Sequence, residues 1–145
     1  MRSENLNRSN GFSLRFESPD TVFVVVSGDV DTAPVAEFLE QLVQWATGKP
    51  YVVLILDVTR LRSYSAGARK ILASNGHRLP PRVFAHFGGS YSAQVMVELV
   101  ARGSSALGSK NRWVTHWPNE ASARSWMEGM RPILAQQAKE LSDQK

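Results

Sequence analysis

Cysteine is absent from the 145-residue chain. This absence excludes disulfides and thiolate metal sites, and it is typical of a protein from a reducing compartment such as the cytoplasm. Long hydrophobic runs are absent too, since no stretch approaches the roughly 20 apolar residues of a membrane-spanning helix. Residues 1–11 are polar and lack the apolar segment of a signal peptide. We therefore expect a cytoplasmic protein that begins with a disordered arm over residues 1–11.

Acidic residues are missing between Asp57 and Glu98, although the net charge of the whole chain is only +4. The same interval holds six basic residues: Arg60, Arg62, Arg69, Lys70, Arg78 and Arg82. This asymmetry indicates either a solvated basic surface or an electropositive face for an anionic partner. Nucleic acid is not expected as a partner, because the chain has no dense Lys/Arg run and no nucleic-acid-binding motif. Peripheral contact with a membrane is a minor alternative.

The remaining composition is that of one folded domain, with 43% hydrophobic and 21% charged residues. Apolar runs and alternating patterns predict strands at 12–18, 21–28, 51–58, 81–88 and 112–117. Helical spacing predicts helices at 31–47, 65–74, 92–102 and from 119 onward, with Asp31 or Thr32 as the cap of the first and Asn119 as the cap of the last. The order β-β-α-β-α-β-α-β-α predicts an α/β fold with about five strands and about four helices. Its sheet is expected to be mixed and mostly parallel after an opening hairpin at Pro19-Asp20.

Two later segments carry more specific predictions. In the third helix, Val95, Met96, Leu99 and Val100 are expected to face inward, followed by a Gly/Ser-rich loop at 103–111. In the last helix, Pro132 is expected to break or kink the backbone. The predicted division is therefore a domain over 12–131 and a C-terminal helical extension over 132–145.

Two short motifs resemble those of the STAS domain family, the SpoIIAA-like group of anti-sigma factor antagonists. Gly28-Asp29-Val30-Asp31 is similar to the family's G-x-L-D turn before the first helix, with Val30 in place of leucine. Asp57-Val58 and Tyr64-Ser65-Ala66-Gly67 match the family's segment after the third strand, where Tyr64 replaces an aspartate and Ala66 a serine. The resemblance covers roughly residues 12–130. It implies the SpoIIAA-like fold, a non-enzymatic role in bacterial-type signalling, and Ser65 at the position of a serine that a partner kinase phosphorylates.

Ser65 itself allows three interpretations. As the first residue of a helix it is a good N-cap, and the same helix end with Arg62, Arg69 and Lys70 nearby would favour a phosphate or another anion. As a nucleophile it is a near miss of G-x-S-x-G, because Ser63 stands where the first glycine belongs. About six residues also separate Val58, the expected strand end, from Ser65, whereas an elbow serine follows its strand directly. The interpretations of Ser65 as a helix cap and as a phosphorylation switch are compatible with each other. The interpretation as a catalytic nucleophile is not favoured.

The other candidate residues are weaker. His86 and His116 lie on predicted strands and could converge, but no metal-ligand spacing exists, so we expect no metal and no cofactor. Trp113, Trp117 and Trp126 are expected to pack together, and Gly88–Ser92 to form a turn capped by Ser90 or Ser92. In a parallel sheet, the carboxyl ends of the strands share one edge. We therefore expect Asp29, Asp31, Ser65 and Gly88–Ser92 to gather at one rim.

These observations give a site prediction. Ser65 is the expected regulatory residue, and no residue is expected to be catalytic. The residues expected to bind a partner or ligand are Asp29, Asp31, Arg62, Ser63, Tyr64, Gly67 and Arg69. The expected partner is a protein, of the anti-sigma factor or serine kinase type. The alternative is an anionic small molecule or lipid held at the basic helix end around Ser65.

Overall fold

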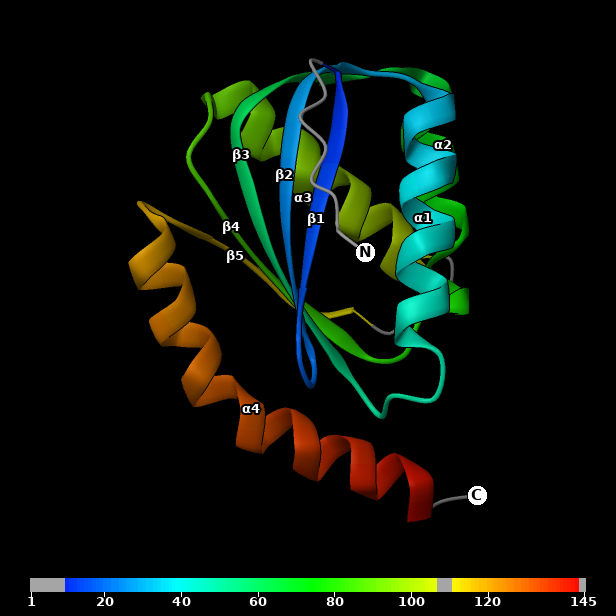
Figure 1. Cartoon of the computed structure of the whole chain (residues 1–145), viewed down its shortest axis with the longest axis vertical. Helices are drawn as coiled ribbons and strands as arrows, with labels where there is room; N and C mark the ends of the chain where they lie inside the picture. Colours follow the sequence, from blue (N-terminus) through cyan, green and yellow to red (C-terminus); the bar gives the residue numbers. More distant parts are fainter. Residues whose placement is uncertain (1–9, 107–110, 144–145) are drawn as a thin grey trace.

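The computed structural model describes residues 10–106 and 111–143. Five strands form one sheet in the order β1-β2-β3-β4-β5, with β1 antiparallel to β2 and every later pair parallel (Figure 1). The strands are β1 (Gly11–Glu17), β2 (Thr21–Val30), β3 (Val52–Tyr64), β4 (Arg82–Phe87) and β5 (Asn111–Trp117). The helices are α1 (Thr32–Ala46), α2 (Ala66–Ser74), α3 (Tyr91–Ala106) and α4 (Glu120–Asp143), with a short 3₁₀ turn η1 (Gly76–Arg78). The predicted fold class and element order are confirmed.

The helices cover the two faces of the sheet unequally (Figure 1). Helices α1, α2 and α3 contribute side chains to one core cluster, together with Val24, Leu54 and other strand residues of that face. Among the described residues, α4 is the only helix on the opposite face, where Met127 and Leu134 pack against Val53 and Ile55. The near-continuous apolar runs of β2 and β3 follow from this arrangement, because a parallel sheet is buried on both faces.

Strand β3 is longer than predicted. It runs to Tyr64, six residues past the expected end at Val58, because Gly28, Asp29 and Val30 extend β2 and pair with Leu61, Ser63 and Tyr64. Register shifts between Val25 and Ser27 and between Gly28 and Asp29 accompany this extension. The polar segment after Val58 looks like a loop in sequence, but the neighbouring strand supplies the hydrogen bonds that keep it extended.

Helix α4 also differs from its prediction. It continues through Pro132 as one helix of 24 residues, so of the predicted break or kink the break is wrong and the kink stays a prediction. Leu134, beyond the proline, is buried. The proposed boundary between residues 131 and 132 therefore falls inside one helix. The cap predicted at Asn119 is present, since its side-chain oxygen accepts from the Ser122 N–H at 2.9 Å.

Helix α3 begins as predicted but packs differently. The Ser90 hydroxyl accepts from the Ala93 N–H at 3.1 Å, so Ser90 rather than Ser92 is the cap. Leu99 is 54% exposed, which corrects the inward orientation expected for it, whereas Val97 is buried. The helix runs to Ala106, four residues past its predicted end, and the rest of the expected loop at 103–111 lies largely outside the described residues.

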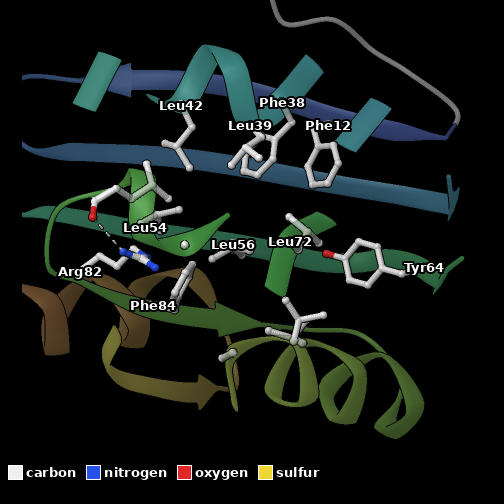
Figure 2. Close-up of a pocket in the computed structure, with 15 residues that line it drawn as sticks. Phe12, Phe38, Leu39, Leu42, Leu54, Leu56, Tyr64, Leu72, Arg82 and Phe84 are labelled. Atoms are coloured by element: carbon white, nitrogen blue, oxygen red, sulfur yellow. Dashed lines mark hydrogen bonds between the residues drawn. The ribbon is translucent and has the colours of Figure 1, made fainter. Parts of the chain in front are cut away.

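The core between the sheet and helices α1–α3 contains a cavity of about 80 Å³ (Figure 2). Most of its walls are apolar side chains such as Phe38, Leu42 and Leu54, and two of its lining residues, Tyr64 and Arg82, carry polar groups. The face of α1–α3 is thus less completely filled than a close-packed protein interior, in which few voids exceed a water molecule.

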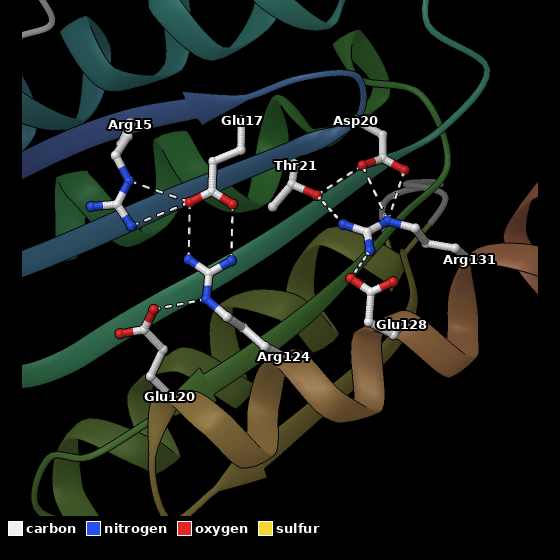
Figure 3. A network of polar contacts seen from close by, with 8 residues as sticks. All are labelled: Arg15, Glu17, Asp20, Thr21, Glu120, Arg124, Glu128 and Arg131. Atoms are coloured by element: carbon white, nitrogen blue, oxygen red, sulfur yellow. Dashed lines mark hydrogen bonds and ion pairs between the residues drawn. The ribbon is translucent and has the colours of Figure 1, made fainter.

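A cluster of charges holds α4 on the other face of the sheet (Figure 3). We call it the arginine cluster; it comprises Arg15, Glu17, Asp20, Thr21, Glu120, Arg124, Glu128 and Arg131. Arg124 donates two 2.9 Å hydrogen bonds to the two oxygens of Glu17 on β1. Arg131 donates to Asp20 Oδ2 at 3.1 Å and to Thr21 Oγ1 at 2.6 Å. Two arginines of one helix therefore fix the hairpin between β1 and β2.

Candidate functional site

The predicted site lies where β2 and β3 end side by side and run into α1 and α2. We call this surface the serine rim and define it as Asp29, Asp31, Arg62, Ser63 and Ser65. The parallel register places Asp29 opposite Ser63 and Val30 opposite Tyr64. The ladder continues one step further, because the Ser65 N–H donates to the Val30 carbonyl at 2.9 Å. Residues 34 positions apart in sequence thus become neighbours on the rim.

The outer pair of the rim is Asp29 with Ser63. The Ser63 hydroxyl donates to Asp29 Oδ1 at 2.8 Å, and Arg62 Nη2 lies 3.8 Å from Asp29 Oδ2. Both charged side chains are more than half exposed, so this ion pair contributes little to stability. The pair leaves a guanidinium and a carboxylate accessible at the surface.

The inner pair joins two helix caps. Asp31 caps α1 by accepting from the Thr32 N–H at 2.8 Å, and Ser65 caps α2 by accepting from the Ala68 N–H at 3.1 Å. The Ser65 hydroxyl donates its proton to Asp31 Oδ1 at 2.9 Å. The bond from the Thr32 N–H, followed by that from Ser65, lowers the pKa of Asp31 below its ordinary value. A negative charge therefore stands directly beside the hydroxyl oxygen of Ser65.

Gly67 brings the two helix starts into contact. A Cβ atom at Gly67 would lie 2.6 Å from Thr32 Cγ2, too close for an ordinary contact. Arg69, one turn along α2, donates to the Tyr64 carbonyl at 3.0 Å and remains exposed. Gly67 thus acts through packing beneath the rim, whereas Arg69 lies next to it.

Tyr64 does not share the surface with the other predicted site residues. Its side chain is 5% exposed and lines the cavity, and burial raises the pKa of its hydroxyl above the ordinary value. The alternation of β3 explains this orientation, because Ser63 faces the rim and the next residue must face the opposite side of the sheet. The carboxylate beside Ser65 comes from Asp31, on the neighbouring strand end.

The structure changes the argument about a serine nucleophile. Because β3 reaches Tyr64, Ser65 stands directly between strand and helix, and the six-residue separation inferred from the sequence is wrong. The backbone at Ser65 is nevertheless unstrained, with φ −64° and ψ 161°, whereas an elbow serine sits on a strained turn. The hydrogen-bond partners of its hydroxyl are a carboxylate and a backbone amide. Both observations describe a helix cap.

The turn at Gly88–Ser92 stands apart from the rim. Added Cβ atoms at Gly88 and Gly89 would meet Thr59 Oγ1 at 2.2 Å and the Val58 carbonyl at 2.6 Å. These contacts place the turn beside the middle of β3, because β3 extends beyond the end of β4. The structure therefore brings Asp29, Asp31 and Ser65 together, and it places Gly88 and Gly89 against a different part of β3.

The histidines converge without forming a metal site. The rings of His86 and His116 lie 5.0 Å apart, and His86 Nε2 lies 3.9 Å from Glu98 Oε2. Burial, and then the nearby His116, lower the pKa of His86 to about 4. Over residues 10–106 and 111–143, no group of three potential metal ligands occurs. The packing predicted for the tryptophans is found for Trp117 and Trp126, whose tilted rings lie 5.9 Å apart, while the side chain of Trp113 lies outside the described residues.

The acid-poor stretch does not form a single basic face. Arg82 is 1% exposed and points into the core, which corrects its expected place on the surface. Arg78 pairs with Glu40 of α1 at 2.8 Å. Arg60, Arg62, Arg69 and Lys70 are exposed, so the accessible positive charge lies along the end of β3 and the start of α2. This is the same end of the molecule as the serine rim.

Two features escaped the sequence analysis. Arg124 and Arg131 lie seven residues apart on one face of α4 and form ion pairs with Glu17 and Asp20. Predicting these pairs would require knowing which face of the sheet α4 covers. Arg82, Phe84 and His86 alternate with Val83, Ala85 and Phe87 on β4. Because strands of a parallel sheet are buried on both faces, that alternation was the available signal that Arg82 points inward.

Comparison of the sequence with family models and with curated proteins finds no match. Comparison with solved structures finds the anti-sigma factor antagonist SpoIIAA in its unphosphorylated form. The two chains share 16% sequence identity with a TM-score of 0.57, and the match covers 82% of this chain and 97% of that one. No helix within the described parts of the chain is long and apolar enough to cross a membrane. The comparison confirms the fold inferred from the two motifs: this chain has the SpoIIAA-like fold.

Proposed function

We propose that this protein is a non-enzymatic, cytoplasmic regulatory module that binds a protein partner through the serine rim, in bacterial-type signalling. The observation that carries the proposal is the hydrogen bond from Ser65 to Asp31, because it joins the starts of two helices through a hydroxyl group that a kinase could modify. The SpoIIAA-like fold supports a partner of the anti-sigma factor or serine kinase type. The exposed side chains of Asp29, Arg62 and Arg69 offer charges of both signs to that partner.

The proposed switch is phosphorylation of Ser65. A phosphoryl group would replace the proton that Ser65 donates to Asp31 and would add a charge of about −1.5 to −2 beside that carboxylate. The N-terminus of α2 and the guanidinium of Arg69 would attract the phosphate, while Asp31 would repel it. Phosphorylation would therefore break the contact between the two caps and make the rim, which already carries Asp29 and Asp31, more negative.

Ser92 supplies a control outside the rim, because it is exposed at the start of α3, next to the turn that lies against a different part of β3. We would immobilise the wild-type protein and the variants Ser65→Asp, Ser65→Ala and Ser92→Asp, and quantify proteins captured from the native cell by mass spectrometry. We expect an anti-sigma factor or serine kinase on the wild type, Ser65→Ala and Ser92→Asp. Its binding to Ser65→Asp should fall at least about tenfold, which corresponds to one misplaced charge at an interface.

A second measurement addresses the modification directly. Incubation with the captured kinase and ATP should add one phosphoryl group to the wild type and to Ser63→Ala, but none to Ser65→Ala, as read by intact mass. Equal modification of Ser65→Ala would refute the switch. Capture of the same partner by Ser65→Asp and wild type alike would refute the rim as the docking surface.

A further inference from the structure

Helix α3 presents apolar side chains to the solvent along one of its sides. Among the residues that the structure describes, four large hydrophobic side chains are exposed, and two of these, Tyr91 and Leu99, lie on α3. Tyr91 is 80% exposed and Leu99 is 54% exposed, and Val95, midway between them, is half-buried. Residues four positions apart lie on the same side of a helix. Tyr91, Val95 and Leu99 therefore form one continuous line, which we call the α3 stripe.

A different side of α3 already holds the helix on the sheet. Ala93, Val97 and Ala101 are buried, at the same four-residue spacing, and Ala93 and Val97 belong to the core cluster. A helix that covers a sheet needs one such apolar side, and its solvent side is ordinarily polar. Tyrosine is among the residues that contribute most to protein–protein binding. Because the α3 stripe is not needed to attach α3, its continuous exposed apolar surface indicates a contact with another molecule.

The charges around the α3 stripe are positive. Arg102 follows the stripe by three positions and is exposed on the same side of the helix. Helix α2 packs beside α3 and carries the exposed side chains of Arg69 and Lys70 (Figure 1). Glu98 is the only acidic residue in the sequences of these two helices, and its carboxylate lies 3.9 Å from Nε2 of the buried His86. The acidic group is thus directed toward the sheet, and the solvent side of α2 and α3 carries cations.

From this arrangement we infer that the α3 stripe is the docking surface for an acidic amphipathic helix of a protein partner. The apolar side of such a helix would lie on Tyr91 and Leu99, and its acidic residues would face Arg102 and the cations of α2. A helix suits the stripe because its apolar side chains recur at the same spacing of three and four residues. Opposite charges beside the apolar contact would fix the choice of partner. This surface contains none of the residues of the serine rim and does not rest on phosphorylation.

The test is a titration of the purified full chain with three synthetic peptides, followed by amide chemical shifts. The first peptide carries leucines along one side of a helix and glutamates elsewhere. The second has lysines in place of the glutamates, and the third keeps the first composition but distributes the leucines around the helix. We expect the first peptide to bind at least about tenfold more tightly than either of the others, with the largest shifts in α3. No binding, equal binding of the first two peptides, or shifts centred on Ser65 would overturn the proposal.

Two exposed aliphatic residues provide paired variants. Leu99 belongs to the α3 stripe, whereas Ile133 is 44% exposed on α4. Glutamine at either position keeps a good helix former and removes only an exposed apolar side chain, so both variants should fold. Binding of the acidic amphipathic peptide should weaken at least about fivefold in Leu99→Gln and stay within about twofold of the wild type in Ile133→Gln. Equal affinities of the two variants would place the peptide elsewhere and overturn the proposal.

Arg102→Glu tests the charge. The preference for the acidic over the basic peptide should fall at least about tenfold in this variant, and an unchanged preference would overturn the proposal. Sedimentation of the wild type and Leu99→Gln tests another occupant. Self-association of the wild type that is lost in Leu99→Gln would assign the stripe to a second copy of the chain, and would also overturn it. Ser65→Ala should bind the acidic peptide like the wild type, so the docking surface and the switch can fail separately.

Discussion

The serine rim and the arginine cluster each join distant segments of the chain through carboxylates, but their donors differ. In the rim, Asp31 accepts from the Ser65 hydroxyl and from a backbone amide at the exposed end of the sheet. In the arginine cluster, Glu17 and Asp20 accept from guanidinium groups that are only about 30% exposed. A hydroxyl can be phosphorylated and a guanidinium cannot lose its charge in a protein. The rim is therefore suited to a switch, and the cluster to a permanent attachment.

The largest loss of stability is expected from a substitution in the most buried part of the arginine cluster. Arg131→Met leaves the Asp20 carboxylate, in a residue that is 5% exposed, without its guanidinium partner. We expect a loss of about 2–3 kcal/mol in the free energy of unfolding, below the full cost of a broken buried pair because Thr21 still donates to Asp20. Urea denaturation measures it. Arg15→Met, which removes an exposed arginine from Glu17, should cost less than about 0.5 kcal/mol. Similar losses in the two variants would contradict this ranking.

Acid should weaken the cluster more than it weakens the rim. The hydrogen bond from Arg124 lowers the pKa of Glu17. Burial raises the pKa of Asp20, but hydrogen bonds from Thr21, Tyr51 and Arg131 outweigh it and leave that pKa lowered as well. Both carboxylates therefore stabilise the fold fully above their ordinary pKa values, near 4, and lose this contribution as the pH falls through their lowered values.

Chemical denaturation between pH 6 and pH 2.5 tests whether the free energy of unfolding falls as these carboxylates are protonated. Its decline below pH 4 should be shallower in Arg124→Met than in the wild type, because Glu17 then has a nearly ordinary pKa in the folded state. Asp31→Asn should change the slope less, since the Asp31 carboxylate is exposed. An unchanged slope in Arg124→Met would remove Glu17 as a source of acid sensitivity.

A smaller effect is expected from the packing beneath the rim. Gly67→Ala would place a methyl group 2.6 Å from Thr32 Cγ2, and we expect a cost of about 1 kcal/mol in the free energy of unfolding. Thr32→Ser removes the opposing methyl group, so the double variant should recover most of this loss. Additive losses in the double variant would show that Gly67 acts through something other than this contact.

The smallest effect is expected at the switch residue itself. Ser65→Ala removes the N-cap of α2 and should cost about 1 kcal/mol or less, as measured by the urea midpoint at constant slope. Ser65→Thr keeps the hydroxyl and should lie within about 0.5 kcal/mol of the wild type. A loss above about 2 kcal/mol in Ser65→Ala would make Ser65 a structural residue and weaken its proposed role as a switch.

The sequence predicted local features well, and the physical reason is their short range. Caps at Asp31, Ser65 and Asn119 depend on residues one or three positions away, and each is present. The strand–helix order followed from hydrophobic periodicity, which is also local. The predicted break at Pro132 failed, because α4 continues through the proline and buries Leu134 against the sheet.

What the sequence by itself determined is thus the order of elements, the helix caps and the position of Ser65 at a helix start. Only the tertiary structure decided that β3 reaches Tyr64, that Ser65 donates to Asp31 across 34 positions, and that Arg82 and Tyr64 face a cavity. These features depend on which strands pair and in what register. A shift of one residue would exchange the two faces of β3, placing Tyr64 at the surface and Ser63 in the core.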